Sequence, residues 1–101
     1  YDQWETEFGL HGGDVETSLM LSFRPECVDM GQAKRFRSSA ENDLIPPTGP
    51  ISRGWIASDL NPAGTVGDAS RATAQKGSQT AQHQVAGFIE LMRKVRDMPV
   101  P

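Results

Sequence analysis

The chain has 101 residues, of which 37% are apolar, and a formal net charge of −3 at neutral pH. A chain of this size and composition builds only a modest core, which is thin for an enzyme that stands alone. The acidic balance excludes a basic face for nucleic acid. No stretch approaches the roughly 20 apolar residues of a membrane span. We therefore expect a soluble, cytoplasmic protein without nucleic-acid or membrane partners.

The first residues of the chain show no pattern of secondary structure. Residues 1–7, YDQWETE, carry no initiator methionine and no clear helix or strand periodicity. We therefore expect the chain to be a piece of a longer protein.

Residues 14–24 predict a short helix. Asp14 can cap it, Glu16 falls in the first turn where the helix dipole favours an acid, and Pro25 ends it by disfavouring a helical conformation at the preceding residue. Apolar residues recur every four positions, and two more widen this stripe, so we expect most of the helix to be buried. The stripe consists of Val15, Leu19 and Phe23, widened by Met20 and Leu21.

Residues 26–67 predict little regular structure. Two segments rich in proline and glycine, 45–54 and 61–68, are typical of turns, and only residues 54–57 (GWIA) predict a short strand. A connection this long indicates a functional loop or a segment that lies on other protein surface. Cys27 is the only cysteine, which fits a reducing compartment, and we expect it to be a small buried residue rather than a reactive thiol.

The last third of the chain predicts a long amphipathic helix that begins after a cap at Asp68 or Ser70 and ends before Pro99. Small residues in its first half favour packing on a sheet over a coiled coil. Gly77 and Gly87 each cost about 1 kcal/mol relative to alanine, so we expect close packing to offset them. The apolar stripe has alternating spacings of four and three: Ala74, Ser78, Ala81, Val85, Phe88, Met92 and Val95. His83 lies off this stripe, and we expect it to be solvated.

Residues 7–17 hold the best candidate for chemistry. His11 is followed by Gly12 and Gly13, which let the backbone turn tightly and approach a ligand. An imidazole there can take a proton from water and return it to a leaving amine, and Glu16 or Asp14 could fix its tautomer. The alternative is a histidine that only satisfies local backbone groups, and spacing alone leaves both interpretations open.

Two blocks of sequence carry a resemblance to a known family. Residues 11–33, HGGDVETSLMLSFRPECVDMGQA, resemble the H-[AG]-[GS]-x-x-E-T-S-x-M-L-x-x-R-P-x-x-V segment of the creatininase (creatinine amidohydrolase) family. Residues 61–77, NPAGTVGDASRATAQKG, are similar to the G-x-x-G-D-x-x-x-A-T-A-x-K-G helix start of that family. The two blocks follow each other in the family's order.

The resemblance implies a metal-dependent amidohydrolase that acts on a cyclic or non-peptide amide. It implies a three-layer α/β/α fold, commonly hexameric, with divalent metal ions (Zn, Mn or Fe). His11 would be the proton-transfer residue, supported by Glu16, and Gly12 and Gly13 would bind substrate. The family's metal ligands lie upstream, in E-x-H and N-G-H-G-G motifs that this sequence does not contain.

The resemblance therefore predicts that residues 1–101 are the C-terminal part of a single creatininase-like domain, without the metal-binding N-terminal part. Members specific for creatinine carry a tryptophan four residues before the histidine. Glu7 stands there in this sequence, which argues against creatinine as the substrate. The alternative function is a non-enzymatic interaction fragment that docks through its amphipathic helices.

Overall fold

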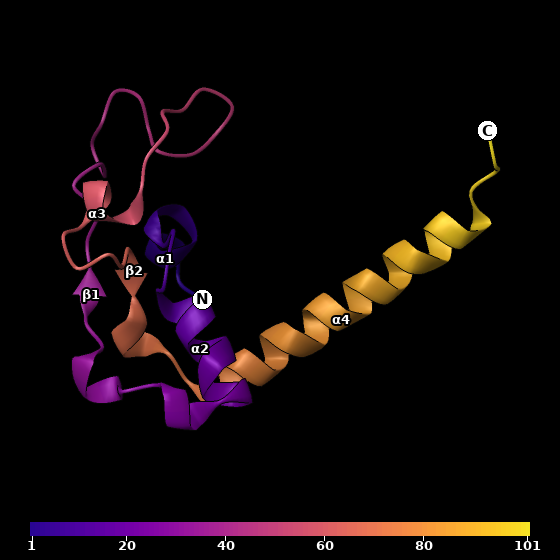
Figure 1. Ribbon diagram of the computed structural model, residues 1–101, viewed down its shortest axis with the longest axis horizontal. Helices are drawn as coiled ribbons and strands as arrows, with labels where there is room; N and C mark the ends of the chain where they lie inside the picture. Colours follow the sequence, from indigo (N-terminus) through magenta and orange to yellow (C-terminus); the bar gives the residue numbers. More distant parts are fainter.

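The computed structural model describes all 101 residues as a small body of short elements from which one long helix extends (Figure 1). Its one sheet has two strands, so the structure is compatible with a fragment of an α/β fold, while the three expected layers are not formed within these residues. The elements are α1 (Gln3–Phe8), α2 (Asp14–Phe23), η1 (Pro25–Cys27), η2 (Met30–Gln32), β1 (Arg35–Phe36), α3 (Ala57–Leu60), β2 (Gly67–Asp68), η3 (Ala69–Arg71) and α4 (Ala74–Asp97).

Helix α1 lies where the sequence pattern predicts no regular structure. The side chain of Asp2 caps it by accepting a hydrogen bond of 2.8 Å from the backbone N–H of Glu5. That bond is the largest cause of a lowered pKa at Asp2, and Arg71, which pairs with the same carboxylate at 2.8 Å, lowers it further. An acid followed three residues later by glutamate is a start signal for a helix, and the short length of α1 hid it from a search for periodicity.

Helix α2 is confirmed almost to the residue, and it ends before Arg24 and Pro25 as predicted. Its cap is Gly13 rather than Asp14, which is already the first helical residue. The predicted burial of the apolar stripe is wrong within this chain, since Phe23 is 58% exposed. The buried positions of α2 are instead polar, Asp14 and Ser18.

The sheet pairs segments that are distant in the sequence. Strands β1 and β2 run antiparallel, with Arg35 opposite Asp68 and Phe36 opposite Gly67. The strand predicted at residues 54–57 is wrong: residues 52–56 have no regular structure and Ala57 begins α3. A β-ladder needs a partner strand, and the preceding proline-rich turns bring none to this segment.

Helix α4 confirms the predicted long helix, but it starts later than predicted. Asp68 lies in β2, and the cap is Thr73, whose hydroxyl accepts a hydrogen bond from the N–H of Lys76. The first turns of α4 pack on α2 rather than on a sheet, while the rest extends away from the body (Figure 1). None of the helices has the length and apolar character needed to cross a membrane.

The two helical glycines of α4 differ. Gly77 is buried, and a Cβ added to it would lie 1.8 Å from the carbonyl oxygen of Ser18, so close helix packing does offset its cost. A Cβ added to Gly87 would have no atom within 4 Å, and nothing in this structure explains the glycine there. His83 is exposed, as expected.

The hydrophobic core is small. Only 13 of the 101 residues are buried, and the apolar cluster consists of Ala40, Leu60 and Val66, with Leu10 and Trp55 against it. Apolar side chains therefore remain at the surface, most of all on α4. Cys27 is also exposed, which corrects the expectation that it would be buried. It lies in the short turn η1, which follows α2 and contacts it, and its side chain remains open to solvent.

Candidate functional site

His11 lies in a turn that the backbone fixes from both sides. Its N–H donates to the carbonyl oxygen of Val66 at 3.0 Å, and its carbonyl oxygen accepts from the N–H of Val66 at 2.7 Å. Gly12 follows with a φ of +67°, in the left-handed region that favours glycine. The backbone of His11 is thus held in place, while the residue is exposed and its side chain forms no hydrogen bond within the chain.

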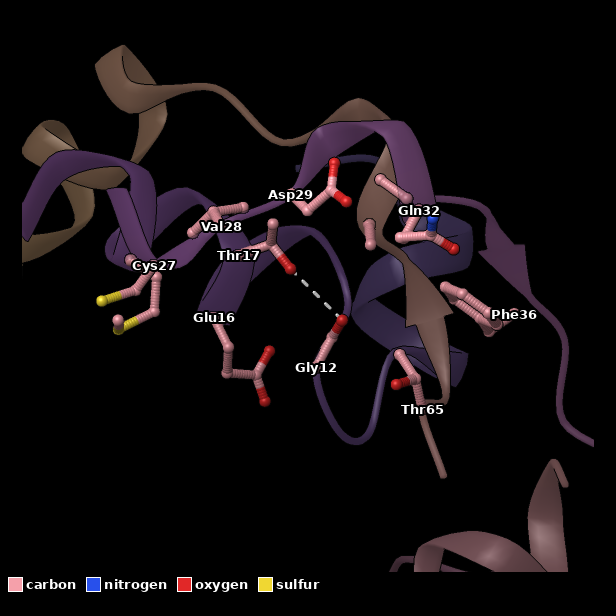
Figure 2. A pocket seen from close by; sticks show the side chains of 12 residues that line it. Gly12, Glu16, Thr17, Cys27, Val28, Asp29, Gln32, Phe36 and Thr65 are labelled. Carbon is pink, nitrogen blue, oxygen red and sulfur yellow. Dashed lines mark hydrogen bonds between the residues drawn. The ribbon is translucent and has the colours of Figure 1, made fainter. Parts of the chain in front are cut away.

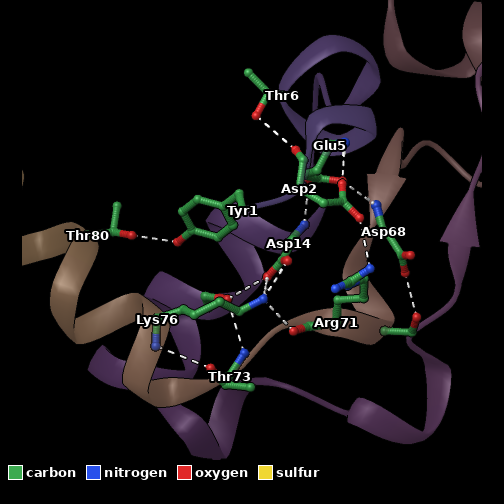
Figure 3. Close-up of polar contacts among 12 residues, drawn as sticks. Tyr1, Asp2, Glu5, Thr6, Asp14, Asp68, Arg71, Thr73, Lys76 and Thr80 are labelled. Atoms are coloured by element: carbon green, nitrogen blue, oxygen red, sulfur yellow. Dashed lines mark hydrogen bonds and ion pairs between the residues drawn. The ribbon is translucent and has the colours of Figure 1, made fainter.

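The carboxylate of Glu5 lies directly beneath this turn. It is buried, with only 3% of the residue exposed. One oxygen accepts a hydrogen bond from the backbone N–H of Asp14 and the other accepts one from the backbone N–H of Asp68, both at 2.7 Å. Figure 3 shows the carboxylate between the start of α2 and β2. Glu5 therefore joins the two segments that flank His11 and Val66.

A second polar cluster fixes α2 against α4. The ammonium group of Lys76 contacts both carboxylate oxygens of Asp14, at 2.6 and 2.5 Å, and donates to the carbonyl oxygen of Arg71 at 2.6 Å (Figure 3). The hydroxyl of Ser18 donates to Asp14 at 2.9 Å and accepts from the N–H of Thr73 at 3.1 Å. The buried charge of Asp14 is thus paired and hydrogen-bonded, as a buried charge requires.

A cleft of about 350 Å³ opens beside the His11 turn (Figure 2). Gly12 and Glu16 stand on one side of it, and the hydroxyl of Thr17 donates to the carbonyl oxygen of Gly12 at 3.3 Å. The cleft combines two carboxylates with an apolar wall. Its lining residues are Gly12, Glu16, Thr17, Met20, Cys27, Val28, Asp29, Gln32, Ala33, Phe36, Thr65 and Ala69.

The side chains present do not fit a metal ion. No group of three or more His, Cys, Asp or Glu side chains comes together in the chain. The two most buried carboxylates, of Glu5 and Asp14, are already bound by backbone N–H groups and by Lys76. Metal chemistry at this site would need ligands from outside these 101 residues.

A protein-family model matches most of the chain. The family model named Creatininase, described as creatinine amidohydrolase, matches residues 2–92. The chain belongs to the creatininase family. Comparisons with curated proteins and with solved structures found no match. Membership indicates amidohydrolase activity at the level of the family, and creatininases are generally metal-dependent.

In this member of the creatininase family the residues that the sequence singles out lie in two places. Gly12 and Glu16 line the cleft, with His11 next to Gly12 at the surface. Gly13 is buried, and its Cα faces Glu5 and Gly67 rather than the cleft. No hydrogen bond joins His11 to Glu16 or to Asp14, so the imidazole is free of the carboxylate contacts that the spacing suggested.

Sequence reasoning missed two side chains that shape this site, Glu5 and Lys76. The spacing from Asp2 to Glu5 signals a helix start and so a defined position for Glu5. No sequence pattern indicates its contact with Asp68, which is 63 residues away. Lys76 and Gly77 stand in the second family block, where the pattern predicts a helix start but no partner for it. Their partners, Asp14 and Ser18, are in the first block.

Proposed function

We propose that this chain is the His11-bearing part of a metal-dependent amidohydrolase that cleaves the C–N bond of a cyclic or non-peptide amide. The observation that carries the proposal is the match to the creatininase family over residues 2–92, because it spans the His11 turn, the cleft and the start of α4. The catalytic roles of His11 and Glu16, and substrate contacts from Gly12 and Gly13, are part of this proposal.

The local geometry supports proton transfer by His11. Its backbone is held by two hydrogen bonds to Val66, whereas its imidazole is solvent-accessible and beside a cleft that admits a small molecule. A positioned imidazole takes a proton from an attacking water and returns it to the departing nitrogen. Because Gly12 has no side chain, an amide substrate can approach the backbone of the turn without meeting a Cβ.

Metal ligands and the rest of the domain are proposed to come from a metal-binding part outside these residues. The support is the absence of a ligand cluster here and the large apolar surface on α4, which needs cover. We call the chain together with that part the completed enzyme. Zn, Mn or Fe would supply Lewis-acid chemistry to the completed enzyme, and a homo-oligomer, hexameric by family resemblance, is part of the same proposal.

A non-enzymatic interaction fragment is the second candidate function. It is favoured by the exposed apolar residues of α4, of which Val85 is 58% and Phe88 61% exposed. The two functions differ in what His11 does, because docking through α4 makes no use of the imidazole.

The test is His11→Gln in the completed enzyme. Glutamine keeps a polar side chain at an exposed position, and the backbone hydrogen bonds to Val66 do not involve that side chain. Folding and metal content should therefore stay as in the wild type. We expect kcat to fall about 10²- to 10⁴-fold. Metal stoichiometry, melting temperature and kcat are measured on one preparation, with an amide that the wild type hydrolyses. A near-normal kcat would remove His11 from the mechanism and favour the interaction fragment.

Glu16→Gln is the companion variant. Glu16 forms no hydrogen bond with His11 in this structure, so a supporting role for it should make its replacement cost less kcat than that of the histidine. The replacement should add little once His11 is already changed. Additive losses in the double variant would instead give Glu16 a role independent of His11.

A further inference from the structure

We propose that Glu5 is a positioning residue that holds the His11 turn in its active shape. This inference rests on the proposed function, because it concerns the same histidine. Glu5 does not line the cleft, and its carboxylate forms no hydrogen bond with the side chain of His11. It acts through the backbone at both ends of the turn, at Asp14 and Asp68.

The first step of the argument is the cradle around the carboxylate. A Cβ on Gly9 would lie 2.4 Å from an oxygen of Glu5, and one on Gly13 would lie 2.2 Å from it. A Cβ on Gly67 would lie 2.6 Å from the Cα of Gly13 and 3.0 Å from the same carboxylate. Three glycines from separate segments thus leave room for one carboxylate and for nothing larger.

The second step is the charge. Glu5 is buried without a lysine or arginine partner, which is costly for a carboxylate unless other groups stabilise it. The two backbone N–H groups do so, and one of them belongs to the first residue of α2, where the helix dipole favours a negative charge. Gly13, the cap of α2, has no side chain to cap the helix, so Glu5 supplies the missing acceptor from another helix.

The third step links the carboxylate to His11. The segment with Leu10 and His11 is bonded to Val66, and the segment with Asp14 is bonded through Glu5 to Asp68. Residues 10–14 are therefore fixed to residues 66–68 at two points, one on each side of the Gly12 turn. Without the Glu5 contact only the Val66 point remains, and the turn that carries His11 can rotate about it.

The experiment is Glu5→Gln in the completed enzyme. An amide offers one oxygen and one NH₂, so it can accept from only one of the two backbone N–H groups and turns a donor toward the other. We expect kcat to fall about 10- to 100-fold, the effect of a small misplacement of a catalytic group, with KM within twofold of the wild type. We also expect faster hydrogen–deuterium exchange, by mass spectrometry, in peptides that contain residues 12–18 and 66–70.

Three comparisons make the result decisive. In a His11→Gln background, Glu5→Gln should cost kcat less than twofold, whereas a merely structural role would lower activity in both backgrounds. Glu90→Gln removes an exposed carboxylate on α4 and should leave kcat and exchange unchanged. If Glu5→Gln does not fold, Gly9→Ala, which places a Cβ 2.4 Å from the carboxylate and has no proposed contact with substrate, should reproduce its kinetic effect. Gly54→Ala, with open space around it, is the neutral control.

The two proposals fail separately. Unchanged exchange at residues 12–18 and 66–70 in a folded Glu5→Gln variant would overturn the positioning role, whatever His11 does. Faster exchange of the turn in Glu5→Gln, together with a normal kcat in His11→Gln, would instead support the positioning role of Glu5 and overturn the proton-transfer role of His11.

Discussion

Asp14 and Lys76 form the ion pair that joins α2 to α4. Asp14 is 1% exposed, whereas the Lys76 side chain keeps 29% of its surface in solvent. The pair is therefore unequal: removing the lysine leaves a buried carboxylate with only the Ser18 hydroxyl, while removing the aspartate leaves an ammonium group that can reach water. Loss of the cation should be the more damaging change, because an uncompensated buried charge is expensive.

We predict that Lys76→Met destabilises the completed enzyme by about 3 kcal/mol, the cost of breaking a buried ion pair. Methionine keeps the apolar stem and removes only the charge. The free energy of unfolding is measured by urea denaturation at neutral pH. A second replacement, Asp14→Asn, should recover part of the loss because a neutral amide is cheaper to bury.

The matched control is Lys94→Met. Lys94 pairs with Glu90 on the same helix, but the two side chains are 71% and 67% exposed, and such pairs contribute little. Its free energy of unfolding should stay within about 0.5 kcal/mol of the wild type. Equal losses for the two lysine variants would contradict the view that burial makes Lys76 important.

At the scale of elements, the contact between α2 and α4 is a close helix crossing that depends on one glycine. Gly77 lies against the Ser18 carbonyl, and the same residue's hydroxyl bonds to Thr73 at the start of α4. Helix propensity and packing oppose each other at position 77. Alanine is the better helix former, but its Cβ would have no room there.

We predict that Gly77→Ala lowers the melting temperature, since a Cβ at 1.8 Å from a backbone oxygen forces the helices apart. Gly87→Ala, on the same helix with open space around it, should raise stability by up to about 1 kcal/mol. Gly87 lies on the helix face opposite Val85. A protein segment that covers the apolar stripe of α4 would therefore not contact Gly87. Differential scanning calorimetry of both variants of the completed enzyme checks this prediction. A fall in melting temperature for Gly87→Ala as large as that for Gly77→Ala would contradict it and show that α4 is also covered on its other face.

The elements that could be predicted are those with local signals. α2 has an acidic first turn and a proline stop, and α4 repeats its apolar pattern over six turns, so both are found close to their predicted ranges. The strands were missed because each has two residues and exists only through its partner, β1 with β2. No local pattern encodes such a pairing.

The candidate site divides in the same way. His11, Gly12 and Glu16 could be chosen from one stretch of sequence, and the structure places Gly12 and Glu16 at one cleft, with His11 next to Gly12. Their roles stay a prediction. Glu5 contacts Asp68, 63 residues away, and Lys76 contacts Asp14, 62 residues away. No local sequence pattern predicts either partner. Burial also escaped prediction: the apolar stripes of α2 and α4 predict packing but do not say which chain segment supplies the cover.

At the scale of the whole molecule, the body and the long helix are unequally stabilised. All 13 buried residues of the chain lie in the body or in the first turns of α4, and the rest of α4 has none. Folding costs roughly 1 to 2 kcal/mol of backbone entropy per residue, and apolar burial on this scale recovers little of it. The proposed remainder of the domain would bury the free face of α4 and so provide the missing stabilisation.

We predict that residues 1–101 expressed alone do not fold cooperatively as a monomer. Proton NMR should show poor dispersion and calorimetry should show no sharp thermal transition, whereas the completed enzyme should give both. Sedimentation must verify the monomer, because self-association through α4 could supply substitute cover. A verified monomer with a sharp transition would count against the C-terminal-part proposal and favour an autonomous interaction module.

The Glu5 contact also sets an order of events during synthesis and folding. Helix α2 is local and can form as soon as its own residues are available, but the His11 turn is closed by a carboxylate whose second partner is 63 residues away. Contacts of such separation form late because loop closure must come first. A nascent chain that ends before Asp68 therefore carries His11 without the turn geometry that we propose for proton transfer. In refolding kinetics, Glu5→Gln should accelerate unfolding and leave the folding rate nearly unchanged.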